Sequence, residues 1–75
     1  MKRKLVEVTW QDSAFYKGWH PKGQHVAPSS CRTTGYLVEK TGRHVVVAMN
    51  SEDDDGGYGE AMAIPRSCIS AIRKL

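Results

Sequence analysis

The stretch TTGYLVEKTGRHVVVAMN, residues 33–50, decides the fold that the sequence predicts. Its first part, residues 33–39, is rich in the β-branched and aromatic side chains that favour strands. Residues 40–43 have the composition of a turn, in which Gly42 can adopt a positive φ without steric cost. The apolar run that follows, residues 44–49, is typical of a strand covered on both faces. The stretch therefore predicts a hairpin in the middle of a closed sheet.

Residues 5–10, LVEVTW, alternate between apolar and polar side chains. A period of two predicts a half-buried strand. Val6, Val8 and Trp10 are expected to face the core, while Glu7 and Thr9 face water.

Residues 11–30 follow neither a strand nor a helix period, and they contain Gly18, Pro21, Gly23 and Pro28. This composition predicts a long loop, and a loop of such length in a small domain is usually functional or mobile. A short helical turn at residues 13–17 is an alternative for part of it. The large side chains of the loop are expected to fold back onto the sheet; they are Phe15, Tyr16, Trp19 and His20.

The second half of the chain predicts two more strands. Residues 51–59, SEDDDGGYG, form a solvated acidic loop, and residues 60–64 resume strand character until Pro65 ends it. One helical turn at residues 65–68 and a last strand at residues 69–73 follow. No helical period is long enough for a bundle or a β-α-β unit, so five short strands are expected to curl into a small barrel, with Gly35 at its sharp bend.

Two motifs resemble known small barrels. Ile64-Pro65-Arg66-Ser67-Cys68-Ile69, followed by Ile72, resembles the strand, single 3-10 turn and strand that close SH3-like barrels. Gly35-Tyr36-Leu37 and the strand at residues 45–48 resemble the related Sm-like barrels. The resemblance implies an all-β fold, a five-stranded SH3-like β-barrel with a long loop after strand 1 and a 3-10 turn before the last strand. The SH3 peptide-binding aromatics and the Sm aspartate–asparagine pair are absent, so neither ligand is carried over.

The whole chain is similar to short proteins encoded in bacteriophages and prophages. The similarity is carried by residues 6–12 (VEVTWQD), residues 34–38 (TGYLV) and Ile64-Pro65 with Ile69. These are scaffold motifs of a family without an assigned activity. The resemblance implies a phage or prophage accessory protein that acts inside the bacterial host cell.

The composition is that of an ordinary globular domain, with 40% hydrophobic and 25% charged residues. The 75 residues are expected to form one domain, 1–75, at a size where a single core is only just sufficient. No apolar run approaches the roughly 18 residues of a membrane helix, and Glu7 interrupts any signal-peptide core. We therefore expect a cytoplasmic protein without a membrane partner, in which thiols stay reduced.

Metal and catalytic sites are not predicted. Four residues have the ligand chemistry of zinc, but their spacing matches no zinc motif, and whether they ever bind metal stays open; they are His20, His25, Cys31 and Cys68. A calcium loop at residues 51–62 would need an oxygen ligand where Met62 stands. Nothing places a cysteine beside a histidine, and residues 56–59 lack the lysine of a phosphate-binding loop. The sequence predicts no enzyme, no cofactor and no small-molecule substrate.

A protein partner or self-association is the leading functional prediction. A chain of marginal size with a valine-rich strand can leave apolar surface that a second copy would bury. The acidic residues 52–55 and the basic termini are expected to form opposite poles, which allows head-to-tail contacts.

Nucleic-acid binding is the alternative, compatible with a net charge of +3 and a pI of about 9.1. Pairing of the first and last strands would gather cations into a basic edge that contacts phosphates. Aromatic rings, including Trp10 and Trp19, are candidates for stacking on bases. The predicted nucleic-acid-binding residues are Lys2, Arg3, Lys4, Arg66, Arg73, Lys74 and Tyr36.

Overall fold

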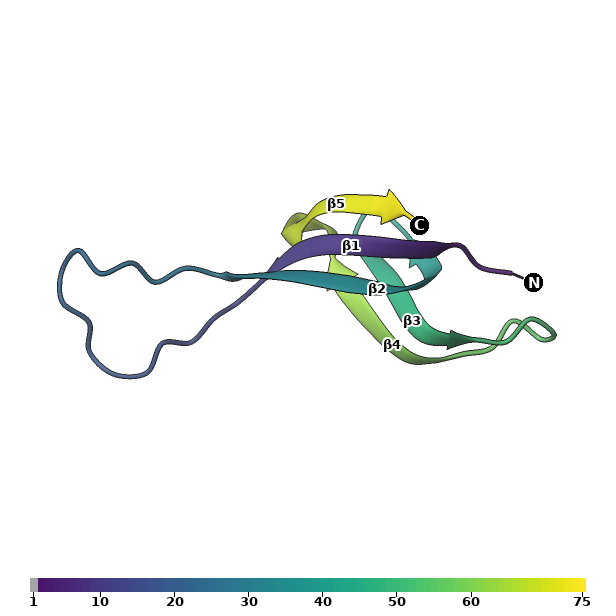
Figure 1. Ribbon diagram of the computed structural model, residues 1–75, viewed down its shortest axis with the longest axis horizontal. Coiled ribbons are helices and arrows are strands. Elements are labelled where there is room, and N and C mark those ends of the chain that lie inside the picture. The colour runs from purple at the N-terminus through teal and green to yellow at the C-terminus, as the bar shows by residue number, and fades with distance from the viewer. Residues whose placement is uncertain (1) are drawn as a thin grey trace.

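The computed structural model describes residues 2–75 as one open antiparallel sheet (Figure 1). The strands are β1 (Leu5–Asp12), β2 (Ser29–Lys40), β3 (His44–Ser51), β4 (Tyr58–Pro65) and β5 (Ile69–Lys74), and the 3-10 turn η1 (Arg66–Cys68) lies between the last two. Their spatial order is β4-β3-β2-β1-β5. The predicted all-β class with five strands is confirmed, and residues 2–75 contain no α-helix.

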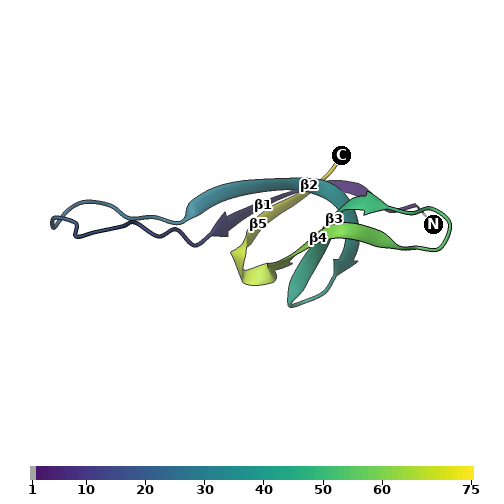
Figure 2. The same ribbon diagram turned by 90° about the horizontal axis from the view of Figure 1, so that it is seen from below.

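Strand β2 is long and bent, and it joins the two halves of the sheet. Its first part pairs with β1, from Asp12↔Ser29 to Leu5↔Tyr36, and its last part pairs with β3. At the bend, a Cβ on Gly35 would lie 2.6 Å from the carbonyl oxygen of Ala48 and 2.7 Å from Cγ1 of Val47. Only glycine lets β3 approach this closely, so β2 curls over the core as Figure 2 shows.

The turn between β2 and β3 is held by Thr41. Its Oγ1 accepts hydrogen bonds from the backbone N–H groups of Arg43 and His44, at 3.1 and 3.0 Å. Gly42 does not adopt the positive φ that was open to it. The predicted hairpin itself is confirmed.

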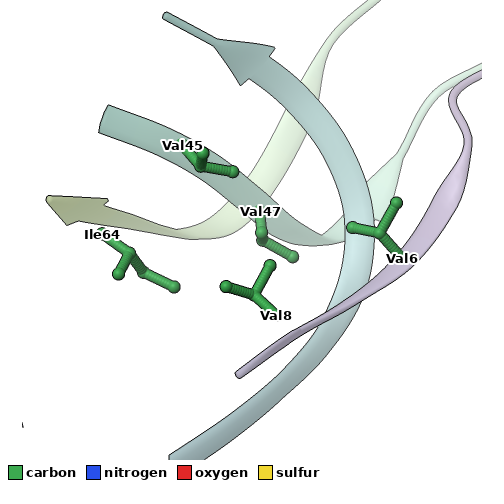
Figure 3. Close-up of a cluster of buried hydrophobic side chains, with 5 residues drawn as sticks. All are labelled: Val6, Val8, Val45, Val47 and Ile64. Atoms are coloured by element: carbon green, nitrogen blue, oxygen red, sulfur yellow. The ribbon is translucent and has the colours of Figure 1, made fainter. Parts of the chain in front are cut away.

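The core is small and consists of aliphatic side chains from three strands. Figure 3 shows Val6 and Val8 of β1 facing Val45 and Val47 of β3 and Ile64 of β4. Val6 and Val8 confirm the inward face predicted from the alternation in β1. The prediction that β3 is covered on both faces is wrong, because Val45 and Val47 are buried whereas Val46 is only partly buried and Met49 is 72% exposed. Trp10 packs at the margin of the core, where its Nε1 donates a hydrogen bond to Thr33 Oγ1 at 2.9 Å.

The first and last strands pair, as predicted. Glu7 lies opposite Arg73 and Val6 opposite Lys74. The Leu75 N–H donates to the Leu5 carbonyl at 2.9 Å, so the two ends of the chain lie side by side.

Residues 13–28 form a finger that projects from the sheet (Figure 1). The molecule is 55 Å long but only 21 × 20 Å in cross-section. Phe15 is 91% exposed and Trp19 102% exposed, so the prediction that these rings fold back onto the sheet is wrong. The β1–β2 ladder runs to Asp12↔Ser29, and the chain therefore leaves along the ribbon axis, away from the core. The short helical turn considered for residues 13–17 is not formed.

Candidate functional site

The predicted basic edge is only partly assembled. The termini bring Lys4, Lys74 and Tyr36 to one end of β1, where Tyr36 lies opposite Leu5 and the Lys4 carbonyl accepts from the Leu37 N–H at 2.8 Å. Arg66 does not join them. It lies at the far end of β5, where its N–H donates to the Arg43 carbonyl at 2.8 Å.

Two cations of this edge already have partners in the fold. The Arg3 guanidinium donates to Ser51 Oγ at 2.9 Å and to the carbonyls of Gly56 and Gly57 at 2.6 and 3.5 Å. Its Cζ also lies 5.3 Å from the centre of the Tyr58 ring, a cation–π distance. Arg73 Nη2 pairs with Glu7 Oε1 at 3.2 Å. The basic edge is therefore left with the exposed lysines Lys2, Lys4 and Lys74.

The acidic loop, residues 52–55, lies beside the basic termini. Arg3 reaches the same β3–β4 connection, and a depression of about 290 Å³ is lined by Lys2, Arg3, Tyr36, Ser51 and Asp53. The expectation that the acidic loop and the termini form opposite poles is wrong, because Arg3 hydrogen-bonds to Ser51 and Gly56 and both segments lie at the same end of the molecule (Figure 1). Neighbouring carboxylates weaken the attraction of these lysines for phosphate.

The candidate metal ligands are dispersed. Residues 2–75 contain no group of three His, Cys, Asp or Glu side chains that could hold a metal ion. His20 and His25 lie in the finger, where His20 Nε2 is 3.1 Å from the Tyr16 carbonyl. Cys31 on β2 and Cys68 on η1 are both free thiols.

The sheet edges are a feature that sequence reasoning missed. In the described chain, β4 and β5 each have a paired strand on one side only. Each edge contains an uncharged run, AMAI at residues 61–64 of β4 and ISAI at residues 69–72 of β5. The sequence marks these runs as strands, but only the spatial order shows that they are edges.

Both edges adjoin exposed surface suited to contacts. A shallow groove of about 430 Å³ follows β5 and is lined by Lys40, Arg66 and residues 69–72. Near the β4 edge, the side chain of Met49 is 72% exposed, that of Tyr58 52% and that of Met62 44%. Apolar side chains along β3 and β4 thus remain open to a partner.

The finger is the second surface of interest. It carries Phe15, Tyr16 and Trp19 together with Lys17 and Lys22, all exposed. Its length predicts a functional or mobile loop, but the prediction that its aromatic rings pack on the sheet is wrong.

Comparison with protein families, curated proteins and solved structures finds no match for this chain. Over residues 2–75, no helix has the length and apolar character needed to cross a membrane.

Proposed function

We propose that this chain is a non-enzymatic protein–protein interaction module that associates with copies of itself through β4 and β5. One observation carries the proposal. Both strands are edges of the sheet, and both present an uncharged four-residue run there.

Unprotected edges are templates for pairing with another strand. Natural sheets usually protect them with lysine, proline, a bulge or a covering element. In β4, Pro65 is the last residue and Glu60 precedes the AMAI run; in β5, Arg73 and Lys74 follow the ISAI run. The middle of each edge therefore lacks lysine and proline, although the β1–β5 register shifts at Ser70, between the pairs Thr9↔Ala71 and Trp10↔Ile69.

The two edges are complementary to each other. The groove along β5 is bordered by the cations Lys40 and Arg66, whereas β4 carries the exposed carboxylate of Glu60. Pairing β4 of one copy with β5 of the next is a head-to-tail contact, which closes into a ring or continues as a filament. Because five side chains form the core cluster, added burial at the edges would raise stability appreciably.

The rest of the proposal concerns the fold type and the setting of the chain. We propose that the sheet is an SH3-like barrel whose edges approach each other across η1. We also propose that the chain is a phage or prophage accessory protein that acts in the cytoplasm of the host cell. Support comes from the β1–β5 pairing, the position of η1 and two free thiols. Support for a non-enzymatic role comes from the dispersion of the histidines, since His44 contacts Glu39 at 2.8 Å and the other two lie in the finger.

Light scattering coupled to size-exclusion chromatography tests the association. The wild-type chain is expected to show a mass that rises with concentration above the 8.4 kDa of one copy. Ala61→Lys on β4 and Ala71→Lys on β5 should each shift the protein to the monomer, because a lysine at an edge opposes pairing. Thr34→Lys is the matched control, since Thr34 is exposed on the inner strand β2.

Two results would overturn the proposal. One is a strictly monomeric wild-type chain up to about 1 mM, well above the Kd range of specific assemblies. The other is a Thr34→Lys variant that dissociates as readily as the edge variants. Circular dichroism verifies that each variant keeps its strands.

Nucleic-acid binding at the basic edge is the second candidate. It is favoured by Lys4, Lys74 and Tyr36 meeting at the end of β1. It has less support than association at the sheet edges, because Arg3 and Arg73 have intramolecular partners and the acidic loop is adjacent. A mobility shift that disappears on replacing Lys2, Lys4 and Lys74 with alanine would favour it over the interaction module.

A further inference from the structure

We propose that the finger, residues 13–28, binds single-stranded nucleic acid. Phe15 and Trp19 would stack on unpaired bases, and Lys17 and Lys22 would contact the phosphates. This site is distinct from the sheet edges and from the basic termini, and it does not depend on self-association.

The finger projects from the sheet to one end of the molecule (Figures 1 and 2), and its aromatic side chains are exposed. Trp19 is 102% exposed and Phe15 91% exposed, whereas Trp10 of the sheet packs against the core. Large aromatic side chains are normally buried or placed at interfaces, because their contact area is a major source of binding energy. Rings held this far from the core indicate a surface that another molecule covers.

The positive charge of the finger favours an anionic ligand. No Asp or Glu occurs between Asp12 and Glu39, a span that contains Lys17, Lys22 and Arg32. The carboxylate of Asp12 stays at the base of the finger, where it accepts from the Ser13 N–H at 2.8 Å.

At the opposite end of the molecule, the acidic loop lies beside the basic termini and offsets much of their positive charge. Residues 52–60 contain Glu52, Asp53, Asp54, Asp55 and Glu60, five of the eight carboxylates of the chain. Figure 1 shows the β3–β4 loop and the finger at the two ends of the long axis. A polyanion is therefore steered toward the finger and away from the acidic loop.

The combination of rings and lysines fits a single strand better than a duplex. In FYKGWHPK, residues 15–22, aromatic and cationic residues are interleaved. Every base has a face on which a ring can stack, but in a duplex those faces are already stacked on each other. A protein partner would also cover the rings, and it is distinguished by the test below.

The backbone of the finger can follow a flexible ligand. Gly18 and Gly23 have φ values of 89° and 96°, and the backbone contact within the finger is a single turn, from the Gln24 N–H to the Pro21 carbonyl at 3.1 Å. A chain with so little internal bonding can adjust the spacing of its rings to that of the bases.

Fluorescence anisotropy with a labelled 20-nucleotide oligothymidine tests the proposal. We expect binding at 50 mM salt that weakens at 200 mM, similar binding of oligouridine, and weaker binding of a duplex of the same length. Phe15→Ala with Trp19→Ala should reduce affinity about tenfold or more per ring. Lys17→Ala with Lys22→Ala should lower the slope of log K against log salt by about 1.4, the share of two phosphate contacts on a single strand.

The control replaces Lys2, Lys4 and Lys74 with alanine, which leaves the finger intact and should not change affinity. The proposal is overturned by no binding at 50 mM salt, by duplex binding as tight as single-strand binding, or by finger variants with wild-type affinity. It is also overturned if the Phe15 and Trp19 changes abolish self-association in light scattering without affecting oligonucleotide binding, because the finger is then a protein contact. Loss of association in the Ala61→Lys variant with retained binding would support it, and would show that the two proposals stand separately.

Discussion

Replacing Gly35 with alanine tests the bend that shapes the sheet. The new Cβ would lie 2.6 Å from a backbone oxygen, that of Ala48, and 2.7 Å from Cγ1 of Val47. A backbone carbonyl in a ladder cannot rotate away, so β2 and β3 must separate near the pair Tyr36↔Ala48. Val47 belongs to the core cluster, and the displacement therefore reaches the core.

The magnitude follows from three contributions. Overpacking of this kind costs about 1–3 kcal/mol. A disturbed ladder hydrogen bond adds about 1 kcal/mol, and the reduced entropy of the unfolded alanine chain offsets about 0.4–1 kcal/mol. The sum is a loss of about 1–3.5 kcal/mol, a large share of the stability of roughly 4–11 kcal/mol expected for 75 residues.

Urea denaturation followed by circular dichroism measures this loss. With an m-value of about 1 kcal/mol/M, the midpoint of Gly35→Ala should fall by about 1–3.5 M. Gly42→Ala is the matched control, because a Cβ there meets no atom within 4 Å and the φ of Gly42 is not in the left-handed region. That control should be neutral or more stable by up to about 1 kcal/mol. The reasoning fails if Gly35→Ala unfolds within about 0.5 kcal/mol of the wild type, or if both variants lose the same stability.

Two further substitutions test local contacts by the same urea titration. Arg3→Ala removes the hydrogen bonds to Ser51, Gly56 and Gly57. It should lower the free energy of unfolding by about 1–2 kcal/mol, the range for partly exposed hydrogen bonds from a charged group. An unchanged free energy of unfolding would mean that these bonds do not hold the β3–β4 loop. Thr41→Ala leaves two N–H groups of the β2–β3 turn without their acceptor and should cost about 1 kcal/mol. An unchanged midpoint would mean that the turn depends on Gly42 and not on the Thr41 hydroxyl.

Local patterns were sufficient to predict the strands. The alternation around Val6 and Val8 specifies a strand and its inner face, whereas the run around Val45 and Val47 specifies a strand but not which of its faces is covered. Gly35 could be assigned to a bend because an interior glycine in a strand has few other uses. These signals depend on near neighbours in the sequence, which is why they could be read before the fold was known.

Contacts between distant parts of the chain were not predictable in the same way. Arg3 binds Ser51 and Gly56, about fifty positions away, and nothing near Arg3 indicates those partners. The direction of the finger depends on where the β1–β2 ladder ends, which composition does not specify. The identity of the edge strands depends on the spatial order, so the candidate interaction surfaces became visible only in the structure.

The two proposed surfaces would reinforce each other. The core cluster draws on β1, β3 and β4 and takes nothing from the finger, so the exposed rings of Phe15 and Trp19 are not explained by stability. A single finger with two rings and two lysines offers few contacts, and its affinity for a strand should be modest. Pairing of sheet edges would place several fingers in one assembly, where each contact raises the effective concentration of the next. Self-association through β4 and β5 would then convert weak single-strand contacts into stable binding along a longer strand.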